Sequence, residues 1–181
     1  ARVEGILKER IGRLPPALQE LLQAASVAGE SFGAEIVAQM LGRDEGQAAA
    51  QVGALLDRQY QLIAVQGSQP AGDGHLSIYR FRHILFQQYL YNSLDTIQRT
   101  HLHRAMADAL VRRYGEHAHL IAPQLARHYA IAGDQEQAVH YFTVAGDGAA
   151  EIYANTEAVS YYCRALAMAQ ESGNITGARL D

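Results

Sequence analysis

The pattern of apolar and polar positions changes its period once, near the middle of the chain, in residues 78–93. Ile78, Tyr79 and Phe81 are side chains that favour β-strands. From His83 onward the apolar residues recur about every 3.6 positions, which is typical of an amphipathic helix. We therefore expect a strand that runs directly into a helix. Arg82 and His83 fall at the junction, where backbone N–H groups lack helical partners.

Four helices are predicted ahead of this junction, over residues 3–14, 17–28, 34–41 and 45–60, because apolar residues recur there at helical spacing. Pro15 and Pro16 end the first helix and suit the first turn of the second. Ser31 is expected to be the N-cap of the third helix and Asp44 that of the fourth.

A β-hairpin is predicted after these helices. Residues 62–66 form a short apolar strand, residues 67–74 (GSQPAGDG) are rich in turn-forming residues, and residues 75–81 form the returning strand. Helices followed by a hairpin are the plan of a winged helix domain. The sequence therefore predicts a mainly α protein in which residues 1–94 form a winged helix domain with one β-hairpin.

The remainder of the chain reads as helical, over residues 96–114, 118–132, 135–153 and from 155 or 156 to about 170, with Asp95 as an N-cap. Small and large residues alternate there as in a tetratricopeptide helix pair, at Leu125, Ala126, Tyr129, Gly133, Asp134, Ala138, Phe142 and Ala145. We expect residues 95–181 to form an α-helical tetratricopeptide-like stack. One unit and a half is fewer than the three that usually stand alone, so we interpret the stack as truncated.

Composition limits the partners and the compartment. The chain has 181 residues, a net charge of −4 and a pI near 6.1, which give no general attraction to nucleic acid or to an anionic membrane. Its apolar runs are too short to span a bilayer, so no membrane association is expected. Cys163 is the only cysteine, which favours a reducing compartment and predicts a cytoplasmic protein.

The sequence predicts that this chain is not an enzyme. It lacks GxxxxGK[ST], HExxH and CxxC. The carboxylates at Glu20, Glu30, Glu35 and Asp57 show no pairing pattern that suggests acid–base work. The histidine pairs 101/103 and 117/119 would point about 200° apart on a helix, so no metal site is expected.

Direct DNA binding by a winged helix would use the helix over residues 45–60. The charged residues in and next to this helix are mostly acidic: they are Asp44, Glu45 and Asp57, with Arg58 as the one basic residue. The polar residues that could read bases are Gln47, Gln51 and Gln59, and the hairpin tip adds Asp73 without a Lys or Arg. Non-specific DNA affinity depends on cations at phosphates, so these residues argue against DNA as a partner.

Several stretches together resemble a known family. They are LPPALQELLQAASVAGESF, the hairpin start at residues 61–63, YRFRHILFQQYLYNSL, RTHLHRAMADAL and LARHYAIAGDQEQAVHYFTVAG. Their order is similar to the region that follows the ATPase core of bacterial STAND-type ATPases, over about residues 3–170. These signal-transduction proteins include LuxR-type and SARP-type regulators, and adenylate cyclases or kinases with a fused AAA-like ATPase.

The resemblance implies a role for His83. In that family a histidine at this junction, the "MHD" histidine of nucleotide-binding immune receptors, touches the β-phosphate of ADP in the resting state. Here Phe81 and Arg82 precede the histidine and Ile84 follows it in place of Asp. The resemblance implies that His83, with Arg82 beside it, contacts ADP held by an upstream ATPase domain. The alternatives are that His83 caps the helix or packs on the hairpin, and that Arg82 is a solvated surface residue.

The sequence therefore supports three hypotheses about function. The first is a non-catalytic regulatory segment that couples the nucleotide state of an upstream ATPase domain to a helical interaction arm, in signal transduction or transcription regulation. It implies ADP or ATP in the parent protein, no cofactor in this segment, and further helical repeats as partners. The second is a scaffold that binds a protein or peptide without any nucleotide. The third is a DNA-binding winged helix.

Overall fold

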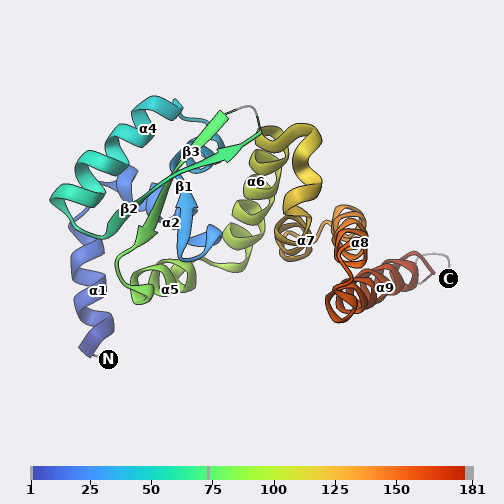
Figure 1. Ribbon diagram of the computed structural model, residues 1–181. Helices are drawn as coiled ribbons and strands as arrows, with labels where there is room; N and C mark the ends of the chain where they lie inside the picture. Colours follow the sequence, from blue (N-terminus) through green and yellow to red (C-terminus); the bar gives the residue numbers. More distant parts are fainter. Residues whose placement is uncertain (1, 73, 178–181) are drawn as a thin grey trace. The chain divides into compact units, whose positions relative to one another are not determined.

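The computed structural model describes residues 2–72 and 74–177, and it is mainly helical with a small antiparallel sheet (Figure 1). The chain divides into two compact units, Ala1–Ala109 and Leu110–Asp181, here called the first and the second unit. The division falls inside α6 (Thr96–Tyr114), so the first turns of this helix belong to the first unit. The predicted boundary between residues 94 and 95 precedes α6.

The helices of the first unit agree well with the apolar spacing. They are α1 (Arg2–Gly12), α2 (Pro16–Ala28), α3 (Ala34–Met40), α4 (Glu45–Gln51) and α5 (Ile84–Ser93). The Asp44 side chain accepts a hydrogen bond from the backbone N–H of Gln47 at 2.8 Å, which confirms it as the N-cap of α4. Asp95 is confirmed as the cap of α6, because it exchanges hydrogen bonds with Gln98 in a capping box.

The predicted helix over residues 45–60 changes its hydrogen bonding part-way along. After α4 the chain continues as the π-helix η1 (Val52–Gln59). The N–H of Tyr60 bonds to the carbonyl of Leu55 at 2.8 Å, five residues back rather than four. A π-helix of this length is unusual, and it ends two residues before Gln61, which has a φ of 52°.

The sheet has three strands, β1 (Ser31–Gly33), β2 (Ile63–Ala71) and β3 (Gly74–Phe81), in the order β1–β3–β2. The prediction of Ser31 as a helix cap is wrong. Ser31 pairs with Arg80 across the sheet, and its hydroxyl donates to Gln66 Oε1 at 2.9 Å. An extended backbone here directs Phe32 into the core, and Gly33 takes the position before α3.

The hairpin is longer than predicted, since residues 67–71 are strand rather than turn. Two features accommodate the turn-forming residues. The register shifts between Val65 and Gly67, where Gly67 has a φ of 139°, as at a β-bulge. Pro70 lies on β2, which is an edge strand of the sheet. An edge strand tolerates proline because its outer side has no neighbouring strand that needs the missing N–H. Asp73, predicted for the tip, lies outside the described residues.

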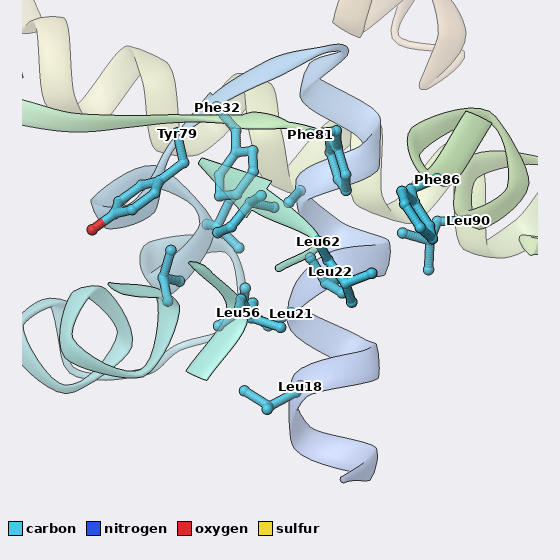
Figure 2. Packing of buried hydrophobic residues seen from close by; sticks show 14 of the residues in the cluster. Leu18, Leu21, Leu22, Phe32, Leu56, Leu62, Tyr79, Phe81, Phe86 and Leu90 are labelled. Atoms are coloured by element: carbon cyan, nitrogen blue, oxygen red, sulfur yellow. The ribbon is translucent and has the colours of Figure 1, made fainter. Parts of the chain in front are cut away.

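The core of the first unit lies between the sheet and the helices (Figure 2). Leu21 and Leu22 of α2 are fully buried, as is Leu56 of η1. Figure 2 shows the Phe32 ring between Tyr79 and Phe81, with ring centroids 6.1 Å and 5.6 Å away. This aromatic cluster joins β1 to β3. Phe32 is the buried side chain of the three-residue strand β1, so its packing is expected to hold β1 on the sheet.

The second unit begins in α6 and continues through the 3₁₀-helix η2 (Gly115–Ile121), α7 (Ala122–Ile131), α8 (Gln135–Glu151) and α9 (Asn155–Gly177). Helix α8 packs on both α7 and α9. The rings of Tyr129 and Tyr141 stack between α7 and α8, 5.7 Å apart and 6° from parallel. The first residues of the predicted helix 118–132 are 3₁₀-helical, and α9 runs beyond its predicted end.

Candidate functional site

His83 occupies the N-cap of α5, at the end of β3. Its φ of −142° and ψ of 131° are extended, and its Nδ1 accepts a hydrogen bond from the Leu85 N–H at 3.3 Å. The interpretation of His83 as a helix cap is thus confirmed. An accepting Nδ1 carries no proton, so the neutral ring bears its proton on Nε2. The side chain is exposed, which leaves Nε2–H available as a donor, and the contact with a phosphate stays a prediction.

Arg82 is held by neighbouring elements rather than freely solvated. Its Nε donates to the carbonyl of Ile63 at 2.7 Å, and its guanidinium forms an ion pair with Asp57 at 2.8 Å. Its backbone N–H donates to the carbonyl of Leu62 at 2.9 Å. Arg82 therefore ties the end of β3 to β2 and to η1. It fixes the backbone from which the next residue, His83, projects.

The ion pair between Arg82 and Asp57 should contribute only modestly to stability. The Arg82 side chain is 45% exposed, so water can solvate the guanidinium group when the Asp57 carboxylate is removed. We expect Asp57→Ala to lower the free energy of unfolding by about 1 kcal/mol. Urea denaturation at low and high salt measures this effect, which should shrink as salt screens the pair.

The matched control is Glu9→Ala, because Glu9 pairs with Arg13 on the exposed face of α1 and should contribute less. Equal losses in the two variants would show that Arg82 gains nothing from its position at the junction.

Three carboxylates that the sequence presented as isolated, Glu20, Glu35 and Asp57, have distant partners. Glu35 accepts hydrogen bonds from the N–H and the hydroxyl of Ser77, at 2.8 Å and 2.7 Å, and so joins α3 to β3. Asp57 pairs with Arg82. Burial raises the pKa of Tyr79 above its ordinary value, and the carboxylates of Glu35 and Asp57 raise it further. These contacts hold the hairpin against α3 and η1.

Two cavities of the first unit are lined by residues other than Arg82 and His83. One of about 210 Å³ is lined by Glu20, Gln23, Met40, Leu41, Leu94, Gln98, His101 and Leu102. Another of about 270 Å³ is lined by Arg10, Arg13, Gln59, Tyr60 and Leu62. Arg10 there donates to the Tyr60 carbonyl at 3.2 Å, so it already serves the end of η1. His83 is therefore presented on a surface rather than in either pocket.

The sequence predicts no metal site at the histidine pairs 101/103 and 117/119. His103 is buried, with Nε2 3.0 Å from the Tyr91 hydroxyl, whereas His101 is exposed. The rings of His117 and His119 lie 6.4 Å apart. Among the side chains that the structure describes, in residues 5–72 and 74–170, no three His, Cys, Asp or Glu residues are grouped so that they could hold a metal ion. Over the same part of the chain, no helix combines the length and apolar character needed to cross a membrane.

Comparison with known proteins gives one similarity. An uncharacterized protein of Rhizobium meliloti is 32% identical over 165 residues, which cover 90% of this chain. The chain spans 15% of the length of that relative. No family model matches the chain, and no solved structure matches it. The similarity therefore relates the chain to one part of a much longer protein that is itself uncharacterized.

Proposed function

We propose that this chain is a non-catalytic regulatory segment of a STAND-type signal-transduction ATPase. Residues 1–94 act as a winged helix that senses the nucleotide held by an ATPase domain of the same polypeptide. The tetratricopeptide-like helices that follow pass this state to partners, as an interaction arm in signalling or transcription regulation. ADP or ATP belongs to the ATPase domain, and the protein works in the cytoplasm.

The observation that supports this proposal is the presentation of His83. Its Nδ1 is engaged by the Leu85 N–H, so the exposed edge of the ring offers an Nε2–H donor. Arg82, the residue before His83, is bound to β2 and η1, which limits how far the imidazole can move. An exposed donor on a rigid junction suits an anionic ligand that another domain encloses. A hydrogen bond to a charged group contributes about 1.5–3 kcal/mol, enough to bias a two-state domain arrangement.

The fold supports the winged helix part of the proposal. The sheet order β1–β3–β2, with β1 placed between α2 and α3, is compatible with a winged helix. The surface of α4 and η1 presents Gln47, Gln51 and Arg58 with little positive charge. This composition favours a partner other than DNA.

The test measures bound nucleotide in the longest natural polypeptide that contains residues 1–181. The purified protein is denatured, and the released nucleotide is assayed by chromatography. We expect ADP in the wild type and a fall of about tenfold or more in His83→Ala, because a charge-assisted hydrogen bond is lost. His101→Ala, an exposed histidine in the same unit, should leave the ADP content unchanged.

A second variant separates the two roles of His83. Asparagine is a good N-cap, so His83→Asn keeps the cap of α5 and removes the imidazole. The proposal expects ADP to fall in this variant as well. ADP that falls in His83→Ala but not in His83→Asn would reduce His83 to a helix cap. Absence of nucleotide from every variant and from the wild type would favour the peptide-binding scaffold.

A further inference from the structure

The second unit carries an exposed apolar patch at the turn between α8 and α9 and along α9. Ile152 and Tyr153 at the turn are 75% and 87% exposed. Val159 and Leu166 of α9 are 61% and 62% exposed, and Cys163 between them is exposed as well. Positions 159, 163 and 166 are spaced as one face of a helix. These five residues are called the outer patch.

Helix α9 therefore has two apolar faces rather than one. Ala158 and Ala165 are buried on the inner face, which packs on α8. A surface helix that meets a single neighbour needs only one apolar face. The outer patch lies on a different face, and it adds nothing to the packing of α9 on α8.

Tyr153 makes no evident contribution to the turn in which it lies. It adopts a φ of 60°, while its N–H bonds to the Ala150 carbonyl at 3.0 Å and the Ala154 N–H bonds to the Ala149 carbonyl at 2.9 Å. Glycine or asparagine takes this position at a helix end with less strain than an aromatic residue. A large ring that is both strained and exposed is costly for folding, so its use lies elsewhere.

The charged side chains of residues 128–163 are all acidic. Residues 128–163 contain Asp134, Glu136, Asp147, Glu151 and Glu157 but no Lys or Arg. Glu151 and Glu157 are exposed on either side of the turn. The next cation along the chain, Arg164, lies over the Phe142 ring at 5.8 Å. The apolar patch is thus bordered by carboxylates without a balancing cation between them.

We propose that the outer patch docks a basic amphipathic helix of a partner protein. The partner's apolar residues, at helical spacing, cover Tyr153, Val159 and Leu166, and its Lys and Arg residues face Glu151 and Glu157. This inference rests on the proposed interaction arm and names the chemistry of its partner. It does not depend on nucleotide, so its test and the ADP test can fail separately.

The probe is a synthetic helical peptide of about 18 residues, long enough to lie along α9, with Leu at helical spacing and Lys elsewhere. Its counterpart carries Glu in place of every Lys. Binding to the 181-residue chain is measured by fluorescence anisotropy. We expect saturable binding of the Lys peptide that weakens when salt rises from about 50 to about 300 mM, and much weaker binding of the Glu peptide.

Variants locate the binding on the outer patch. Val159→Ser with Leu166→Ser should weaken binding about tenfold, since apolar anchors dominate such interfaces. Tyr153→Gly should raise the melting temperature by removing strain and yet weaken binding, a combination that a purely structural role would not give. Ile97→Ser removes an exposed apolar residue of the first unit and should leave binding unchanged.

Three results would overturn the proposal. One is equal binding of the Lys and Glu peptides, and another is unchanged binding in Tyr153→Gly and in the Val159 and Leu166 double variant. The third is the lack of any saturable binding of the Lys peptide at low salt.

Discussion

Replacing Phe32 by alanine should lower the free energy of unfolding of the first unit by about 3–5 kcal/mol. The ring is buried between Tyr79 and Phe81, and it is the core side chain of a strand with only three residues. Its removal leaves a cavity at the centre of the aromatic cluster and frees β1 from β3. Hydrogen exchange of the β3 amides measures the loss within this unit, without requiring the whole chain to unfold in one step.

The control for Phe32→Ala is Val65→Ala on β2. Val65 is an exposed side chain of the same sheet, so its truncation should change stability by no more than about 0.5 kcal/mol. Similar losses in both variants would mean that the aromatic cluster does not determine the attachment of β1.

Gly146→Ala should destabilise the second unit, although alanine is the better helix former. A Cβ at Gly146 would lie 2.6 Å from Cε1 of Tyr162, and the Tyr162 hydroxyl is held by Asp147 at 2.6 Å. Overpacking of this kind costs about 1–3 kcal/mol. Helix propensity favours alanine over glycine by about 1 kcal/mol, so the overpacking cost outweighs this gain over most of its range. Thermal denaturation followed by circular dichroism measures the change.

Gly148→Ala is a matched control in the same helix with the opposite expected sign. No atom lies within 4 Å of a Cβ at Gly148, so the substitution should stabilise α8 by about 0.5–1 kcal/mol. Adding Tyr162→Ala to Gly146→Ala should restore the helix-propensity gain, because the overlapping ring is gone. If Gly146→Ala stabilises the protein as Gly148→Ala does, the Tyr162 ring moves aside without cost.

Sequence patterns predicted the parts of the fold that depend on near neighbours. Asp44 and Asp95 were predicted as N-caps, and each accepts a hydrogen bond from an N–H three residues ahead. Helix α9 begins at Asn155, as expected. Apolar periodicity and caps are local signals, and the helices follow them closely.

The parts that sequence missed depend on distant partners. The first strand is defined by pairing of Ser31 with Arg80, and no local signal distinguishes it from a helix cap. The strand character of residues 67–71 comes from the ladder with β3, which overrides their turn propensity. The π-helical bonding of η1 likewise has no signal in the spacing of its apolar residues.

The candidate site shows the same division. The position of His83 at a strand–helix junction followed from the change of period, and its hydrogen bond reaches only two residues ahead. The partners of Arg82 are 19 and 25 residues away in the chain, at Ile63 and Asp57. Sequence could therefore locate the imidazole but not the ion pair and hydrogen bonds that hold the residue before it.

The irregularities of β2 bear on how this protein behaves at high concentration. An outer strand with free N–H and C=O groups can template the pairing of another chain and begin aggregation. Here the bulge at Gly67 interrupts the repeat of β2, Pro70 removes a donor, and the strand at the other border of the sheet has only three residues. Neither border offers a long, regular row of hydrogen-bonding groups, so the sheet resists growth beyond its own three strands.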